Sequence, residues 1–314
     1  MYLQAEHLQG ILFAFLAALF WGLSPILNKK ALQEMGLWKT NAFRGAGAIV
    51  LLLLLLPLAF IVNPTNTREL LFLSVSAYLT LVAIAFLNNM VGDVLYLSAI
   101  RDVGVSVAAP IASSFPLIVA FISWLWFGEA LTFSVLVGTV FVVGGLALLN
   151  RRAAEARTDS RYLRGVTASA LTALCWAVGL TFTKYLTLQG VASESMVFWR
   201  GIFVGVMAIT LLPVVSKNET SDKSDKSNKK FTFRPPSAVS VFAAMGAGIV
   251  GLVVGTWFYI SSLLLIPMNV ATPISSSGPL VAVVLACVLM GESLRPIQWA
   301  GIVLVVSGAV FVSL

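Results

Sequence analysis

Charged residues are scarce in this chain. They make up 11% of its 314 residues, whereas hydrophobic residues make up 59% and the mean hydropathy is +0.96. Roughly a quarter of the residues in a soluble globular domain are charged, so the composition excludes an ordinary soluble protein. Apolar segments of about 20 residues recur along the sequence, and each is long enough to cross a hydrocarbon layer about 30 Å thick. The sequence therefore predicts an all-α polytopic membrane protein.

Metal-binding and thiol side chains are also rare. The chain contains a single histidine, His7, and two cysteines, Cys175 and Cys287, which both fall inside apolar runs. This set is too small and too scattered for a recognisable zinc site or a disulfide framework. We therefore expect no metal site and no cofactor, and coupling of the protein's activity to a proton or another ion stays open.

Motifs of several enzyme classes are missing from the sequence as well. The chain has no HExxH, no GxSxG, no P-loop and no pair of aspartates within its apolar runs. These absences argue against a membrane-embedded hydrolase and against an ATP-driven pump.

Polar breaks between the apolar runs predict ten transmembrane helices. They cover residues 8–28, 38–62, 70–100, 105–127, 132–149, 163–187, 194–215, 237–264, 269–290 and 296–313. The third and eighth runs are longer than a straight crossing needs, so we expect these helices to tilt, kink or project from the bilayer. The first run lacks a basic flank and a small-residue cleavage site, and we interpret it as a retained helix rather than a signal peptide.

Two polar segments interrupt the apolar pattern. One is basic and follows the fifth run, and the other, residues 216–236, is polar and low in complexity. We therefore expect a first five-helix repeat over residues 1–150, a basic connecting loop over 151–164, and a second five-helix repeat over 165–314 that contains the polar loop.

The two halves of the chain carry the same pattern of proline, serine, glycine and glutamate. Residues 109–131 read APIASSFPLIVAFISWLWFGEAL, and residues 272–294 read TPISSSGPLVAVVLACVLMGESL. An offset of 163 positions joins Pro110 to Pro273, Ser113 to Ser276, Ser114 to Ser277, Pro116 to Pro279, Gly128 to Gly291, Glu129 to Glu292, Gly138 to Gly301, Gly145 to Gly308, Gly92 to Gly255 and Tyr96 to Tyr259. With small shifts of the offset, Trp21 pairs with Trp176, Lys29 with Lys184 and Arg44 with Arg200. The chain therefore contains an internal repeat that covers most of its length.

Five helices in each half have a topological consequence. Because five is an odd number, the second half must enter the membrane from the side opposite to the first. The fold expected is thus ten transmembrane helices arranged as two inverted five-helix repeats. Inverted repeats are typical of secondary transporters, in which the substrate site lies near the midplane where the halves meet.

The order of these motifs resembles the EamA family of the drug/metabolite transporter superfamily. The matching residues are Trp21-Gly22, Phe43-Arg44-Gly45, and the two prolines followed by Gly-Glu in each half. The resemblance spans nearly the whole chain. It implies two five-helix repeats, export or exchange of small metabolites such as amino acids, and a central cavity lined by four helices of each half.

The paired prolines are candidate hinges or gates. Proline has no N–H, so Pro116 and Pro279 each leave a carbonyl one turn earlier without a partner, which favours a protein or aqueous environment over lipid. Two interpretations stay open: a packing kink whose serines bond their own backbone, or a hinge that contacts substrate or water. The candidates are Pro110, Pro116, Pro273 and Pro279 for the hinge, and Ser113, Ser114, Ser276 and Ser277 for the cavity.

Asp93 is the one carboxylate in the interior of a predicted span, since Glu194 is the first residue of its span. Asn89, Asp93 and Tyr96 share one face of the third helix, and the repeat places Thr256 and Tyr259 at the positions equivalent to Asp93 and Tyr96. A charge at this depth is costly, so we expect Asp93 to face the bundle interior and to bind a cationic group or a coupling proton. The alternative is an interfacial aspartate, solvated or paired with a nearby arginine.

Two arginines and two tryptophans recur in mirrored positions. Arg44 and Arg200 either extend their side chains to the membrane surface or form a mirrored gate that anchors a substrate carboxylate. Trp21 and Trp176 either pack within the bundle or line the cavity. The mixture of Ser, Asn, Tyr, Trp and one Asp suits a small zwitterionic or cationic metabolite.

Glu129 and Glu292 each follow a glycine between two predicted helices. Acidic side chains are stabilising near a helix N-terminus, so we interpret both as structural residues at these junctions.

Charge and family resemblance predict opposite orientations. Most loop Lys and Arg residues lie on the side of the connection between the fifth and sixth spans, so the positive-inside rule puts both termini outside. The resemblance to the EamA family implies that both termini lie inside. The net charge of +7 is carried mainly by loops, which indicates lipid contact rather than nucleic-acid binding.

The leading hypothesis is a secondary transporter of the cell (plasma) membrane, an exporter or exchanger that works by alternating access. The expected partners are a small-molecule substrate and the lipid bilayer, and closely spaced glycines allow a homodimer. A lipid-handling or scaffold protein is the alternative, and a membrane-embedded enzyme is a weaker one.

Overall fold

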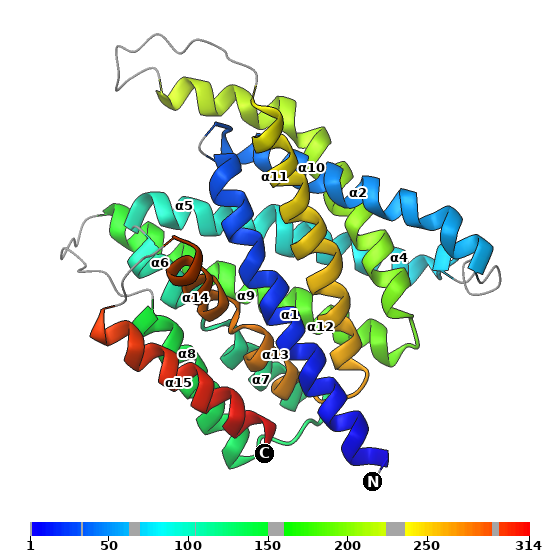
Figure 1. Ribbon diagram of the computed structural model, residues 1–314, viewed down its shortest axis with the longest axis vertical. Helices are drawn as coiled ribbons and strands as arrows, with labels where there is room; N and C mark the ends of the chain where they lie inside the picture. The colour runs from blue at the N-terminus through cyan, green and yellow to red at the C-terminus, as the bar shows by residue number, and fades with distance from the viewer. Residues whose placement is uncertain are drawn as a thin grey trace.

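The computed structural model describes residues 2–32, 34–62, 70–103, 105–149, 160–223, 236–290 and 295–314. Within these ranges every regular element is a helix, and nine helices are long and apolar enough to cross a membrane. A tenth apolar helix, α8 (Phe133–Leu149), is shorter. Figure 1 shows the helices packed as one bundle with both termini at the same end. The all-α, multi-span architecture predicted from the hydropathy pattern is confirmed.

The first repeat contains α1 (Tyr2–Leu32), α2 (Leu37–Val62), α4 (Val75–Ile84), the π-helical segment η1 (Ala85–Gly92), α5 (Asp93–Val103), α6 (Val105–Ala112), α7 (Phe115–Phe127) and α8. The third span thus consists of α4, η1 and α5, and the fourth of α6 and α7. The third span begins at Val75 and not at residue 70 as expected. Its first turn starts where the Ser74 hydroxyl accepts a hydrogen bond from the backbone N–H of Ala77, a typical N-cap.

The second repeat contains α9 (Ser160–Leu188), α10 (Ser193–Lys223), α11 (Ala238–Gly248), the π-helical segment η2 (Ile249–Gly255), α12 (Thr256–Leu263), α13 (Met268–Ser275), α14 (Gly278–Met290) and α15 (Pro296–Ser313). Two boundaries differ from the expected spans. The helix α9 begins at Ser160, within the expected connecting loop, and α10 continues to Lys223, past the end of its apolar run. Helical hydrogen bonds do not require an apolar side chain, so a helix can project beyond the hydrophobic layer.

The fourth span of each repeat breaks at the same Ser-Ser pair. The helix α6 ends before Ser113 and α7 begins after Ser114, while α13 and α14 are separated by Ser276 and Ser277. The Ser114 hydroxyl donates to the Ile111 carbonyl at 2.7 Å, and the Ser277 hydroxyl donates to the Ile274 carbonyl at 2.7 Å. Serines therefore bond their own backbone at both breaks, and the two joints are equivalent in position.

The third span of each repeat contains a π-helical segment, which the hydropathy pattern did not predict. In η1 the backbone N–H of Asp93 reaches the carbonyl of Asn88, five residues earlier. In η2 the backbone N–H of Thr256 donates to the Val253 carbonyl, and the Thr256 hydroxyl donates to the Gly251 carbonyl at 3.2 Å. A π-segment inserts an extra residue into a helix and often occurs at functional sites. The two segments account for part of the unusual length of these apolar runs.

The repeats are intertwined rather than side by side. In the chain's first half, α1 packs against η2 and helices α11 to α14 of the second half, and α9 of the second half packs in turn against η1 and helices α4 to α7. The main buried core therefore combines side chains of both repeats, such as Ala14, Leu81, Leu180 and Tyr259.

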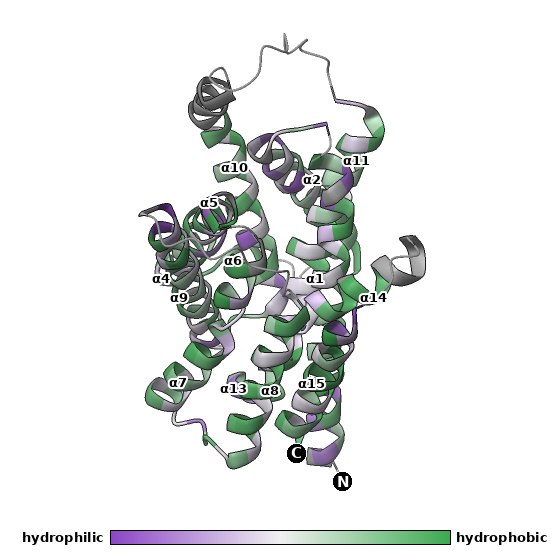
Figure 2. Ribbon diagram, turned by 90° about the vertical axis from the view of Figure 1, so that its left-hand side faces the viewer, coloured by the Kyte–Doolittle hydropathy of each residue, from purple (hydrophilic) through white to green (hydrophobic). Residues whose placement is uncertain are grey.

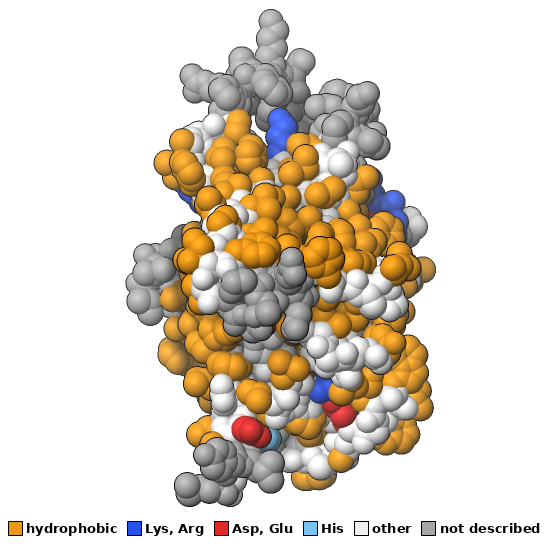
Figure 3. Space-filling view, turned by 90° about the vertical axis from the view of Figure 1, so that its right-hand side faces the viewer, with side chains coloured by type: hydrophobic (Ala, Val, Ile, Leu, Met, Phe, Trp, Pro, Cys, Tyr) orange, Lys and Arg blue, Asp and Glu red, His pale blue; other side chains and the backbone are white. Residues whose placement is uncertain are grey.

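Large apolar side chains also cover the outside of the bundle, among them Leu54, Phe72, Trp126, Phe242 and Val303. Figure 2 shows hydrophobic residues along most helices, and Figure 3 shows orange side chains over much of one face. A soluble protein rarely exposes apolar patches of this extent, whereas lipid tails stabilise such a surface.

Glycines lie where the last helices of the two repeats, α8 and α15, pack against each other. A Cβ atom added to Gly145 would lie 2.7 Å from the Gly301 carbonyl oxygen, and one added to Gly138 would lie 2.7 Å from the Gly308 carbonyl oxygen. Residue numbers rise along α8 as they fall along α15, so the two helices are antiparallel. This orientation is the one expected for inverted repeats, and small residues allow the close approach that stabilises helix pairs in lipid.

The adjacent glycines Gly144 and Gly145 provide a matched test of this contact. Gly145→Ala should lower the melting temperature of the purified protein in detergent, because overpacking costs about 1–3 kcal/mol. Gly144→Ala should leave the melting temperature unchanged or raise it, since no atom lies within 4 Å of the added Cβ and alanine favours the helix by about 1 kcal/mol. Equal effects of the two substitutions would contradict the close packing of α8 on α15.

Candidate functional site

Two tryptophans each extend from a helix of one repeat and contact the third span of the other repeat. The ring of Trp21 packs 5.2 Å from the ring of Tyr259, and the ring of Trp176 packs 5.4 Å from that of Tyr96. The nearest glycines leave room for the indoles: a Cβ atom on Gly255 would lie 2.6 Å from Trp21, and one on Gly92 would lie 2.9 Å from Trp176. The mirrored tryptophans therefore pack against the ends of η2 and η1, where the two repeats meet.

The two tryptophan contacts differ in their hydrogen bonds. The indole N–H of Trp176 donates to the Asp93 carboxylate at 3.2 Å. The indole N–H of Trp21 donates instead to the backbone carbonyl of Gly251 at 3.2 Å, which also accepts the hydroxyl of Thr256. The indole that packs on η1 thus donates to a carboxylate, whereas the indole that packs on η2 donates to a backbone carbonyl. Only the first repeat carries a charge at this position.

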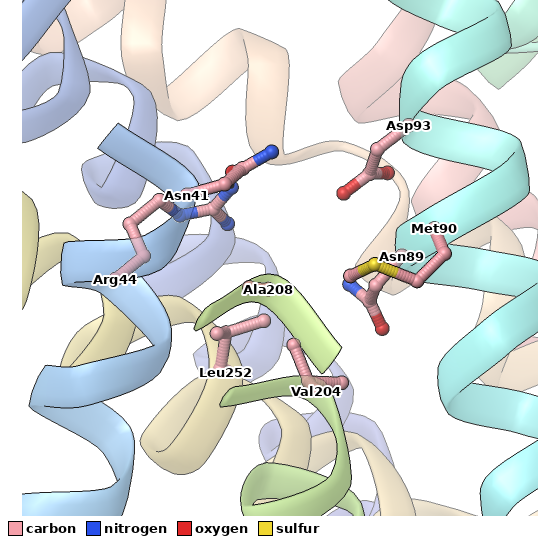
Figure 4. Close-up of a pocket in the computed structure, with 8 residues that line it drawn as sticks. All are labelled: Asn41, Arg44, Asn89, Met90, Asp93, Val204, Ala208 and Leu252. Carbon is pink, nitrogen blue, oxygen red and sulfur yellow. The ribbon is translucent and has the colours of Figure 1, made fainter. Parts of the chain in front are cut away.

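A small cavity, which we call the polar cavity, lies between α2, η1, α5, α10 and η2. Its volume is about 10 Å³, which is room for about one water molecule. Its walls are formed by Asn41, Arg44, Asn89, Met90, Asp93, Val204, Ala208 and Leu252. Figure 4 shows Arg44 and Asp93 on opposite walls. The Arg44 guanidinium donates through Nη1 to the Asn41 side-chain oxygen at 2.8 Å.

Arg200 lies on the α10 face that forms one wall of the polar cavity. Val204 and Ala208 follow Arg200 by four and eight residues, a spacing that places the three side chains on one face of the helix. Arg200 is only 9% exposed, so its side chain does not extend to the protein surface.

Several polar atoms around the cavity have no hydrogen-bond partner in the described part of the chain. They are Nε of Arg44, Nη1 of Arg200 and the side-chain oxygen of Asn89. A buried donor or acceptor without a partner costs about 1–3 kcal/mol, and more for a charged group. Such atoms are therefore available for water or for a bound solute.

The repeat places a second cavity opposite the first, and its lining is apolar. Val197, Leu52 and Val253 in its wall are the repeat equivalents of Asn41, Ala208 and Met90. This apolar cavity has a volume of about 300 Å³ and is lined by Leu51, Leu52, Leu55, Leu56, Ala59, Leu70, Glu194, Val197, Phe198, Val253, Val254 and Trp257. Its one carboxylate, on Glu194, accepts the indole N–H of Trp257 at 3.0 Å. Symmetry-related positions therefore have different chemistry.

The structure divides the predicted cavity residues among several places. Arg44, Asn89 and Asp93 line the polar cavity, and Trp176 joins Asp93 to Tyr96 beside it. Trp21, Thr256 and Tyr259 meet separately at η2, and Arg200 is buried in α10. The Ser113, Ser114, Ser276 and Ser277 group and the prolines Pro110, Pro116, Pro273 and Pro279 lie instead at the two helix breaks. Tyr259 is fully buried, and its hydroxyl forms a hydrogen bond with Thr272 at 2.9 Å.

Sequence reasoning missed Asn41, Met90, Val204, Ala208 and Leu252 as lining residues. Helical spacing carried a signal for some of them: Asn41 precedes Arg44 by one turn, and Val204 and Ala208 follow Arg200 on its own face. Leu252 could have been predicted because it is the repeat equivalent of Asn89. No pattern pointed to Met90, because a methionine in an apolar helix is typical of ordinary packing.

Glu129 lies between α7 and α8 and contacts the second repeat. Its carboxylate accepts the backbone N–H groups of Met268 at 2.8 Å and Asn269 at 2.9 Å, at the start of α13. The ammonium of Lys184 lies 3.8 Å from the same carboxylate and donates to the Leu263 carbonyl at 2.8 Å. Glu129 thus binds the N-terminus of α13, and Glu292, at the equivalent position, lies outside the described residues.

Exchange of Glu129 tests whether this contact stabilises the bundle. Glu129→Gln should lower the melting temperature in detergent, because it leaves the buried Lys184 without a counter-charge. Lys184→Met should also lower it, and the double variant should lose less than the sum of the single losses, since the two groups interact directly. The exposed Glu6→Gln is the control and should have no effect. Additive losses would contradict a direct interaction.

Comparisons with known proteins agree with this architecture. The family model described as "EamA-like transporter family" matches residues 8–151 and 163–314. An uncharacterized transporter of Archaeoglobus fulgidus is 25% identical over 177 residues, which are 56% of this chain and 59% of that protein. An uncharacterized transporter of Clostridium kluyveri is 26% identical over 141 residues, which are 45% of this chain and 43% of that protein. The alignments thus span about half the length of these relatives.

A protein of known crystal structure shares the fold. It superposes with a TM-score of 0.76 at 15% sequence identity, covering 97% of this chain and 98% of the other. The family model matches both halves of the sequence separately, as the internal repeat predicts. On this evidence, the chain belongs to the EamA-like transporter family.

Proposed function

We propose that this protein is a secondary transporter, an exporter or exchanger that moves a small solute through the polar cavity by alternating access. The observation that carries the proposal is a charged cavity between two inverted repeats in an otherwise apolar bundle. Charged side chains within membrane spans are costly and typically mark a substrate or ion pathway. Family membership supports the same assignment and favours transport over catalysis.

The joints and contacts at both ends of the bundle suit a change between two conformations. The Ser-Ser breaks divide the fourth span of each repeat into two short helices, which can change their mutual angle without breaking a continuous helix. The contact between Glu129 and α13 closes one end in this conformation, and its release would open that end. In this scheme the two halves, residues 1–150 and 165–314, rock about the polar cavity in the cell membrane.

Lipid handling is the second candidate function, and the apolar cavity favours it. That cavity is lined almost entirely by aliphatic and aromatic side chains, which suit an acyl chain. A thermal-shift screen over amino acids, amines, nucleotides and sugars, followed by flux of the stabilising solutes into proteoliposomes, would support transport. Scrambling of fluorescent lipids by the same proteoliposomes without solute flux would support the second function instead.

The repeat provides a control for the proposed role of Asp93. Asp93→Asn keeps the side chain's size but removes its charge, and it should lower the initial rate of solute uptake about tenfold or more, equivalent to roughly 1.4 kcal/mol. It should also abolish the pH dependence of uptake if Asp93 carries a coupling proton. Thr256→Val, at the equivalent position in the other repeat, should retain most of the activity. Uptake by Asp93→Asn with unchanged rate and pH dependence would exclude the role.

A further inference from the structure

The apolar cavity carries a single charge in its wall. Among the described side chains that line it, Glu194 is the only charged one, and the others are aliphatic or aromatic. Glu194 is exposed, so its carboxylate lies where the cavity reaches the protein surface. Trp257 in the same wall donates its indole N–H to Oε1 of Glu194 at 3.0 Å. The other carboxylate oxygen, Oε2, has no hydrogen-bond partner among the described residues and remains available as an acceptor.

The packing of α2 on α10 places this carboxylate at one end of the cavity. A Cβ atom on Gly45 would lie 2.6 Å from the Cα of Gly205, and one on Gly201 would lie 2.6 Å from Leu52. Residue numbers therefore rise along α2 as they fall along α10, and the two helices are antiparallel. The cavity follows α2 from Leu51 to Ala59, which is about 12 Å of helix. Its far end lies beside the start of α10, where the carboxylate is, and its near end is enclosed by aliphatic side chains.

A cavity with one charged end and an apolar interior matches an amphipathic cation. Its volume of about 300 Å³ is at the lower end of the range for small-molecule pockets and fits a compact body, such as one ring with a short chain. Phe198 and Trp257 offer aromatic surfaces that attract both rings and cations. The carboxylate of Glu194 attracts an ammonium group and repels an anion, and apolar walls of low dielectric strengthen its field.

We propose that the apolar cavity binds a hydrophobic organic amine, with its apolar body between α2, α10 and η2 and its ammonium group on Oε2 of Glu194. This site is separate from the polar cavity, and the proposal holds whether or not the protein transports the amine. In a bilayer the competing occupants are phospholipids, whose acyl chains also suit apolar walls. Each phospholipid carries an anionic phosphate, however, which the carboxylate disfavours, so the charge in the wall selects the amine.

The first repeat has no counterpart of this site. Trp38 occupies the position equivalent to Glu194, and Val94 occupies the position equivalent to Trp257. The polar cavity on that side has a volume of about 10 Å³, which leaves no room for a ring. We therefore expect one amine per chain.

Three compounds of similar size separate the effect of charge from that of hydrophobicity: 4-phenylbutylamine, 4-phenylbutanol and 4-phenylbutyrate. Their dissociation constants are measured by equilibrium dialysis of the radiolabelled compound against the purified chain, with the same detergent on both sides. Hydrophobicity alone would favour the alcohol over the ammonium ion. The amine should nevertheless bind about threefold or more tightly than the alcohol, at one site per chain, and the carboxylate should bind most weakly. Equal affinities, or tighter binding of the alcohol, would overturn the proposal without any substitution in the protein.

Two substitutions locate the binding site. Glu194→Gln keeps an oxygen that accepts the Trp257 indole but removes the charge, so it should abolish the preference for the amine and leave binding of the alcohol unchanged. Val254→Phe adds a ring inside the cavity and should weaken binding of the amine and of the alcohol about tenfold or more. The matched control is Val306→Phe at an exposed position of α15, which should change neither affinity. A preference for the amine that persists in Glu194→Gln, or amine binding that survives Val254→Phe, would contradict the assignment.

Competition with a lipid decides between the amine and an acyl chain. Bound 4-phenylbutylamine should stay bound in the presence of 1-oleoyl-lysophosphatidylcholine at equal concentration, whereas displacement by this lipid would identify an acyl chain as the preferred occupant and overturn the proposal. None of these measurements uses flux. A failed transport assay therefore leaves the amine site standing, and a failed binding assay leaves transport through the polar cavity standing.

Discussion

The reciprocal packing of Trp21 and Trp176 across the two repeats is the contact on which the rest of the site depends. Each indole leaves its own repeat and rests on a glycine at the end of the other repeat's π-segment. A side chain larger than hydrogen at Gly92 or Gly255 would exclude the ring. Because the indole N–H needs a partner inside the bundle, the same contact orients Asp93 in one repeat and uses the Gly251 carbonyl in the other.

The elements that recur in both repeats therefore form the scaffold, and the residues that differ between the repeats determine the chemistry of the site. The breaks at the Ser-Ser pairs, the π-segments and the glycine contacts between α8 and α15 occur in equivalent places in both halves. The charges do not recur in this way. The position equivalent to Asp93 is occupied by Thr256, and the cavity equivalent to the polar cavity is apolar. The two halves therefore differ in the chemistry that they offer a bound group, since one cavity is polar and the other is apolar.

The glycine spacings also illustrate how one pattern allows more than one use. Gly138 and Gly145, with their equivalents Gly301 and Gly308, have the spacing of a helix-pairing motif, which allowed a homodimer as an expectation. In the structure these four glycines face one another within a single chain. Their small size lets α8 and α15 approach closely, and that approach joins the ends of the two repeats.

Sequence alone determined the number and approximate extent of the helices, the internal repeat and the position of the helix breaks, because hydropathy, proline and serine act locally along the chain. It also indicated Asp93, Arg44 and Arg200 as candidate site residues, since a charge in an apolar run is conspicuous. Only the tertiary structure decided that Glu129 binds the start of α13, that Trp176 reaches Asp93, and that η1 and η2 are π-helical. In a membrane protein the faces toward lipid and toward other helices are both apolar, so composition does not reveal which helix packs against which. The side chains that meet across a bundle are set by that packing.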